Sequence, residues 1–131
     1  MATGGTAVKT ERLAEFRTRT MRPVDLVHLA KQCLGDEMLE LEVLRLFDST
    51  LKSYYDRLQL AQTFDELAMT LHSIKGAAAG VGAWAIADFV KVMEHDMRSG
   101  RPLTQERIAD LGLVIEDVRN FIARMVANET A

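Results

Sequence analysis

Apolar residues recur at spacings of three and four along most of the chain, which is the period of an amphipathic α-helix. Four long segments show this pattern, and no stretch shows the alternation typical of a β-strand. The apolar positions are Leu39, Val43, Phe47, Leu51, Tyr54 and Leu58; then Phe64, Leu67, Leu71, Ile74 and Ala78; then Ile86, Phe89, Val90, Met93 and Met97; and finally Ile108, Leu111, Ile115, Val118, Ile122 and Met125. The pattern predicts four amphipathic helices that share one core.

A shorter apolar pattern precedes these segments. It follows Pro23 and ends at Gly35, a residue type that often terminates a helix. Its apolar positions are Val24, Val27, Ala30 and Leu34. We therefore expect a short first helix with these positions on one face.

Polar capping residues and glycines mark the boundaries of the long helices. Asp36 is placed to cap the first of them, and Thr63 with Glu66 three residues later forms a capping box before the second. Gly80 and Gly82 make the backbone unusually free, so the second helix is expected to end or bend there.

The connections between the expected helices are short, which favours antiparallel neighbours. We therefore expect an all-α fold, an antiparallel up-and-down four-helix bundle with a short additional N-terminal helix at one end. The bundle domain is expected over residues 21–131. Residues 1–20 lack a sustained apolar period, and we expect a flexible N-terminal arm there.

Composition narrows the class of protein. The chain has 131 residues, of which 48% are hydrophobic and 27% charged, and this suits one domain with a hydrophobic core. The net charge is −3 and no block of Lys or Arg stands out, so we expect no binding to nucleic acid or to an anionic membrane surface. No apolar run approaches the roughly 20 residues that span a bilayer.

The location of the protein is also suggested by its sequence. The lone Cys33 cannot form an internal disulfide, and the N-terminal residues lack the apolar core of a secretory signal. Both features predict a cytoplasmic protein.

The sequence TLHSIKGAAAG, residues 70–80, places a histidine among small residues on the second long helix. His72 lies about 100° around the helix from the core-facing Leu71, so we expect its side chain to be accessible. The small or apolar residues on the neighbouring turns of the same side are Ala68, Met69, Gly76 and Ala79. They form a candidate docking surface around the imidazole.

The residue types around His72 suit phosphoryl chemistry. A neutral imidazole can act as a nucleophile, and the ammonium of Lys75 suits phosphate oxygens. A glycine inside a helix costs about 1 kcal/mol relative to alanine, so Gly76 requires a reason, and a flat approach path for another protein is one. A second interpretation is also open, in which His72 has no chemical role. A solvated histidine beside small residues that only allow close helix packing would give the same sequence pattern.

The run of His72, Ile74, Lys75 and Gly76, with Gly82 ten residues after the histidine, resembles the motif of histidine-containing phosphotransfer (HPt) domains. These domains are small four-helix bundles, and the resemblance extends over about residues 23–127. It implies that His72 is the phosphoacceptor and that Lys75 is the cation beside the phosphoryl group. It also implies that Gly76 lets a receiver domain dock and that Gly82 occupies the turn into the next helix.

The same resemblance implies a place in two-component signal transduction. His72 would accept a phosphoryl group from the aspartyl-phosphate of a response-regulator receiver domain and pass it to another. A hybrid histidine kinase is a further expected partner. The receiver domain would supply Mg²⁺, so we expect no cofactor in this chain. Its three histidines and Cys33 lack the spacing of metal ligands.

No P-loop pattern occurs in the sequence, so we expect a phosphocarrier and not an enzyme that phosphorylates itself from ATP. We expect it to be a monomer. The alternative function is a non-catalytic helical interaction or scaffold module that uses the same surface. Trp84 is expected to pack against the bundle, and a place at the rim of the docking surface is the alternative.

Overall fold

The computed structural model describes residues 22–130, which form five α-helices and no strand. The helices are α2 (Leu26–Gln32), α3 (Glu37–Leu60), α4 (Phe64–Val81), α5 (Trp84–Arg98) and α6 (Gln105–Thr130). The arm expected over residues 1–20 lies outside the described residues. The expectation of an all-α fold is confirmed for the described part of the chain.

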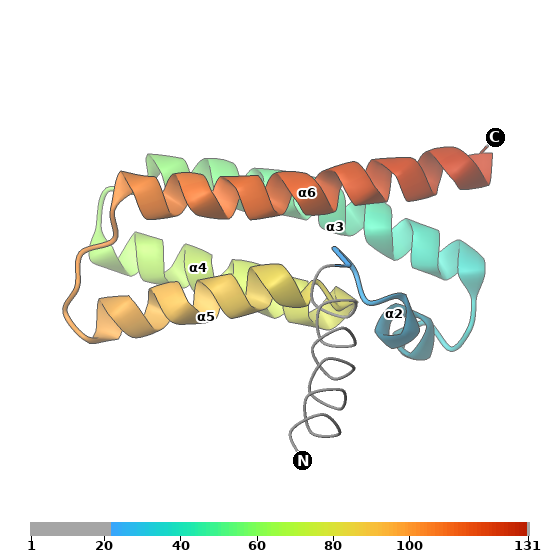
Figure 1. Cartoon of the computed structure of the whole chain (residues 1–131), viewed down its shortest axis with the longest axis horizontal. Helices are drawn as coiled ribbons and strands as arrows, with labels where there is room; N and C mark the ends of the chain where they lie inside the picture. The colour runs from blue at the N-terminus through green and yellow to red at the C-terminus, as the bar shows by residue number, and fades with distance from the viewer. Residues whose placement is uncertain (1–21, 131) are drawn as a thin grey trace, which may run out of the picture.

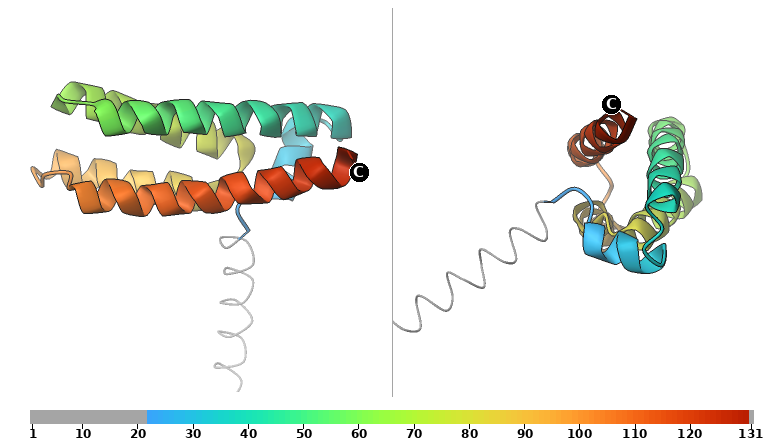
Figure 2. Two further views of the ribbon diagram at one scale, coloured as in Figure 1. Left: turned by 90° about the horizontal axis from the view of Figure 1, so that it is seen from above. Right: turned by 90° about the vertical axis from the view of Figure 1, so that its right-hand side faces the viewer.

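The four long helices run alternately up and down and pack as an antiparallel bundle (Figure 1). The end-on view in Figure 2 shows α3 to α6 around a common centre, with α2 lying across one end. The longest helices, α3 and α6, extend past α4 and α5 at that end (Figure 1). The short α2 packs against α3 and α4 there, as the additional helix that was expected.

Side-chain caps begin α3 and α4 at the expected residues. The Asp36 carboxylate accepts a hydrogen bond from Leu39 N at 3.1 Å. The Thr63 hydroxyl accepts one from Glu66 N, also at 3.1 Å. The Glu66 carboxylate reaches back to Gln62 N at 3.0 Å, one residue before the position of an ideal capping box.

The core lies between the long helices, and no polar or charged residue among the described ones is buried in it. Its fully buried side chains include Leu44, Leu51, Leu58, Leu71, Ile74, Ile86, Val90, Met93, Leu111 and Val118. Most positions predicted from periodicity are buried. Leu39 and Phe64 are exposed instead, because each lies in the first turn of its helix, near an end of the bundle.

The short helix corrects one prediction. Because α2 begins only after its N-cap, Asp25, the helical period counted from Val24 has the wrong phase. The buried residues of this segment are Val24, Leu29 and Cys33. Val27 and Leu34, predicted to share a face with Val24, are 64% and 93% exposed.

Hydrogen bonds hold α2 to the turn between α4 and α5. Asp25 N donates to Gly82 O at 2.9 Å, and Trp84 Nε1 donates to Asp25 Oδ2 at 3.0 Å. The His28 Nε2 atom lies 3.2 Å from Gly80 O, and its ring packs edge-on against Trp84 with 4.9 Å between the centroids. Trp84 therefore packs within the fold, as expected.

Gly82 ends α4 in the left-handed conformation, with φ +87°. A Cβ atom at this position would lie only 3.1 Å from atoms of both Asp25 and His28. The positive φ and the close approach of the α2 segment therefore both favour glycine here. The helix ends where the glycine pair indicated.

Candidate functional site

His72 projects from the middle of α4 into solvent. Leu71, Ile74 and Ala78 turn toward the core and are fully buried. His72 follows Leu71 by one position, which rotates its side chain by about 100° away from the core. The side chain is 76% exposed, so the expected accessibility of this histidine is confirmed.

Glu94 on α5 faces both His72 and Lys75 on α4. Its Oε2 atom lies 3.6 Å from His72 Nδ1, and its Oε1 atom lies 2.5 Å from Lys75 Nζ. The Glu94 side chain is only 14% exposed. An imidazole, a carboxylate and an ammonium thus meet at the interface of α4 and α5.

The Lys75 ammonium compensates a buried negative charge. Glu94 Oε1 is buried, and the Lys75 ammonium is its polar partner. A buried carboxylate oxygen is costly without such a partner. The sequence pattern predicts a cation near His72 but not its pairing with a carboxylate, and this pair fixes where the cation lies.

Glu94 is the residue of this cluster that was not predicted from the sequence. It lies four positions after Val90 and three before Met97, two buried residues of α5. A charged residue at the spacing of the apolar stripe is rarely buried without a partner. That irregularity in the stripe is the signal that could have identified it.

The residues expected to form a docking surface differ in their packing. Met69 and Gly76 are exposed, whereas Ala68 and Ala79 are half-buried against the core. A Cβ atom at Gly76 would meet no atom within 4 Å. Packing among the described residues therefore does not require glycine at position 76. The cost of glycine in a helix, about 1 kcal/mol relative to alanine, is not explained by this packing.

Two further properties concern residues 22–130 only. In this part of the chain no group of three or more His, Cys, Asp or Glu side chains is placed to hold a metal ion. Its helices are also too short or too polar for any of them to cross a membrane.

The protein is thus a helical bundle that exposes a histidine beside a carboxylate and an ammonium. The family model described as the Hpt domain matches residues 42–124, which is more than half of the chain and includes all three of these side chains. The chain therefore belongs to the Hpt domain family, whose members are phosphocarrier modules that interact with receiver domains in phosphorelays. No curated protein and no solved structure matches the chain.

Proposed function

We propose that this chain is a histidine phosphotransfer protein of a two-component phosphorelay. His72 accepts a phosphoryl group from the aspartyl-phosphate of one receiver domain and passes it to an aspartate of another. The exposed His72 ring beside Glu94 and Lys75, in a chain of the Hpt domain family, carries this proposal. The carrier acts as a cytoplasmic monomer and does not phosphorylate itself from ATP.

The contact with Glu94 distinguishes the two ring nitrogens of His72. Nδ1 lies 3.6 Å from Glu94 Oε2, so a proton on Nδ1 faces a carboxylate. In a neutral imidazole the other nitrogen then carries the free lone pair. Nε2 is therefore the nucleophile in this proposal, and Glu94 positions the ring and sets its tautomer.

The transfer step balances without loss of a proton from the ring. Nε2 forms a bond to phosphorus while the bond from phosphorus to the aspartate oxygen breaks, and the aspartate leaves as a carboxylate. The ring keeps its Nδ1 proton and gains positive charge, which the Glu94 carboxylate stabilises. The return step runs in reverse, with a carboxylate of the second receiver as the nucleophile.

Lys75 provides the cation for the transferred group. It lies three residues after His72 on the same helix, a spacing that brings side chains onto neighbouring turns. A phosphoryl group on His72 offers this ammonium a second anion besides Glu94. Lys75 can then contact phosphate oxygens while it remains close to the carboxylate.

The open surface beside the ring accommodates the receiver domain. Met69 offers an exposed apolar side chain, and Gly76 leaves the helix surface bare one turn after His72. The half-buried Ala68 and Ala79 keep the remaining surface low. Mg²⁺ belongs to the acidic pocket of the receiver in this proposal, so the carrier needs no cofactor of its own.

The test is phosphotransfer from a panel of ³²P-labelled receiver domains. We expect rapid labelling of the wild-type protein and none of the His72→Gln variant. His95→Gln is the matched control, because His95 is an exposed histidine on α5 outside the cluster. Its labelling should equal that of the wild type.

The chemistry of the label provides a second readout. Phosphohistidine is labile to acid, so the label should be lost on acid treatment. Label that persists in His72→Gln would place the phosphate on another residue. No transfer from any receiver to a folded protein would favour the scaffold module.

A further inference from the structure

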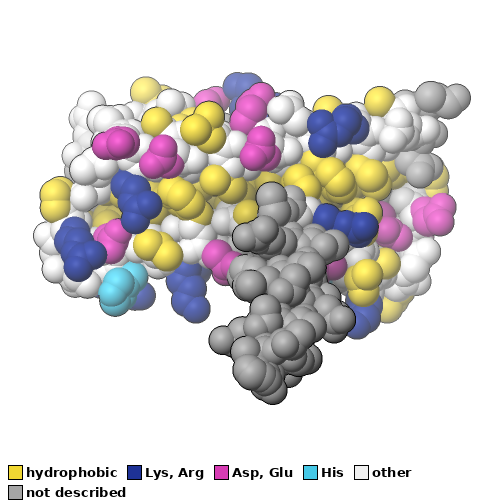
Figure 3. All heavy atoms as spheres, viewed as in Figure 1, with side chains coloured by type: hydrophobic (Ala, Val, Ile, Leu, Met, Phe, Trp, Pro, Cys, Tyr) yellow, Lys and Arg dark blue, Asp and Glu magenta, His cyan; other side chains and the backbone are white. Residues whose placement is uncertain are grey.

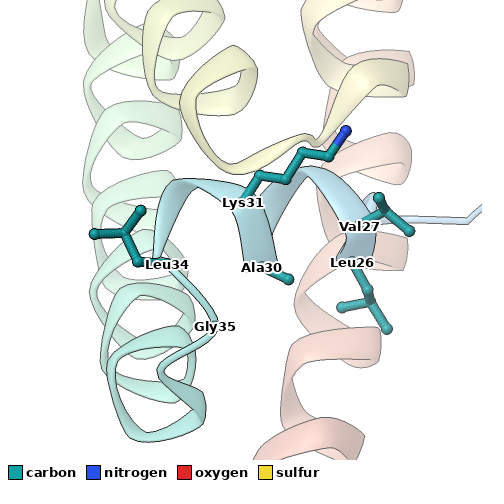
Figure 4. A pocket seen from close by; sticks show the side chains of 6 residues that line it. All are labelled: Leu26, Val27, Ala30, Lys31, Leu34 and Gly35. Carbon is teal, nitrogen blue, oxygen red and sulfur yellow. The ribbon is translucent and has the colours of Figure 1, made fainter.

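A shallow, open apolar groove lies on the outer face of α2, at the end of the bundle. Its volume is about 650 Å³, and its lining residues are Leu26, Val27, Ala30, Lys31, Leu34 and Gly35 (Figure 4). Figure 4 shows Leu34 at one end of the groove and Leu26 with Val27 at the other. These residues lie outside the range 42–124 that matches the Hpt family model.

Leu34 is unfavourable in this position for two independent reasons. Its backbone is left-handed, with φ +53°, a conformation in which the Cβ atom of a leucine is crowded. Its side chain is also 93% exposed. Glycine or asparagine would avoid both penalties, and backbone strain of this kind often accompanies a binding role.

The edge of the groove toward α3 is acidic. Asp36 and Glu37 follow Gly35 directly, and Glu37 and Glu40 line an adjoining hollow together with Leu26. Space-filling spheres in Figure 3 show acidic side chains among the apolar ones at this end of the molecule. Among the described residues, the only charged side chain that lines the groove itself is Lys31, so basic side chains of an occupant should lie toward the acidic start of α3 and its apolar side chains in the groove.

Residues 1–21 of this chain have that composition. They contain four basic and two acidic residues, a net charge of +2 against −3 for the whole chain, so the remainder carries −5. Leu13 and Phe16 lie three positions apart and are flanked by Arg12 and Arg17. The segment runs directly into Arg22, close to the groove residue Leu26.

The covalent connection strengthens a weak interaction. A segment tethered by a short linker meets its site at an effective concentration of about millimolar. Even a low intrinsic affinity for the groove is then sufficient for substantial occupancy. A free partner would need much tighter binding to compete.

We propose that residues 9–21 of this chain bind the α2 groove, with Leu13 and Phe16 against Val27 and Leu34. The basic side chains of the segment then face the acidic start of α3. This interaction is independent of phosphoryl transfer at His72.

The test is methyl and aromatic NMR on the full-length protein. We expect nuclear Overhauser contacts from the Phe16 ring to the methyl groups of Val27 and Leu34. The double variant Leu13→Ser with Phe16→Ser should shift both groups of methyl resonances, whereas the control Thr18→Ser should not. Leu60, an exposed leucine at the far end of α3, provides an internal control whose resonances should stay in place.

Two outcomes would overturn the proposal. Val27 and Leu34 methyl resonances that do not respond to the double variant would show that the segment leaves the groove empty. Contacts that disappear on about tenfold dilution would show that a second copy of the chain occupies it, because intramolecular binding does not depend on concentration.

Discussion

Glu94 of α5 lies against His72 of α4, with its Oε2 atom 3.6 Å from the ring Nδ1 atom. If this contact sets the nucleophilic tautomer, Glu94→Ala should slow phosphoryl transfer to His72 by about tenfold or more. Glu94→Gln should lose less, because its amide oxygen can still present an acceptor to the Nδ1 proton, without the negative charge. Rapid-quench transfer from one labelled receiver measures both rates.

The matched control for Glu94 is Asp88→Ala, which removes an exposed carboxylate from the same helix. It should transfer at the wild-type rate. Equal rates for Glu94→Ala and the wild type would remove Glu94 from the mechanism. Helical circular dichroism of each variant checks that the bundle is intact.

The Gly76→Gln variant should change the docking of a receiver domain and the stability of the fold in opposite directions. A Cβ atom at Gly76 meets nothing within 4 Å, and glutamine is the better helix former, so the free energy of unfolding should rise by about 0.5–1 kcal/mol. Transfer from a receiver should nevertheless slow by about tenfold, because the new side chain stands on the approach surface. Ala109→Gln, at an exposed position on α6, should transfer normally. Unchanged transfer by Gly76→Gln would exclude the steric role.

Gly112 on α6 should not tolerate alanine, because α3 approaches it closely. A Cβ atom there would lie 2.9 Å from Tyr55 Cζ and closer still to the hydroxyl oxygen. That hydroxyl donates to Ile108 O at 2.9 Å, so the ring cannot move without losing a hydrogen bond. We expect Gly112→Ala to destabilise the protein by about 1–3 kcal/mol in urea unfolding.

Gly80→Ala is the comparison for Gly112→Ala. Gly80 is also helical, and a Cβ atom there meets nothing within 4 Å. Alanine should therefore stabilise α4 by up to about 1 kcal/mol. Equal effects of the two substitutions would show that helix propensity decides both and that the Tyr55 contact is unimportant.

Asp25 should make the attachment of α2 dependent on pH. Hydrogen bonds from Trp84 Nε1 and His28 N hold the pKa of Asp25 below its usual 3.8. Because the folded pKa is lowered, the stabilisation is present above the unfolded pKa and is lost as the pH falls through the folded value. Asp25→Asn, which resembles the protonated form, should cost about 1 kcal/mol at pH 7.

The difference between Asp25→Asn and the wild type should close below about pH 4. Trp84 is the only tryptophan of the chain, so its fluorescence reports on this junction during unfolding. A difference in unfolding free energy that stays constant down to pH 2.5 would contradict the role of the charge.

The long helices could be predicted because their determinants are local. The stripe from Leu71 to Ala78, the Thr63 cap and the Gly82 end all act within a turn or two of the backbone they affect. The exposure of His72 follows from the same period. In the short α2, by contrast, a period counted from Val24 misplaced Val27 and Leu34, because Val24 precedes the N-cap Asp25 and lies outside the helix.

The helices, their order and the outward face that carries His72, Lys75 and Gly76 could thus be predicted from the sequence, since all of these depend on the helical period. The contacts of Glu94 with His72 and Lys75, and the hydrogen bond that joins Asp25 to Trp84, emerge only when the helices are packed together. Both contacts cross between helices, so they depend on how far and at what rotation one helix packs on another. Side-chain packing in the core sets this relative shift and rotation of the helices, and local sequence patterns do not predict it.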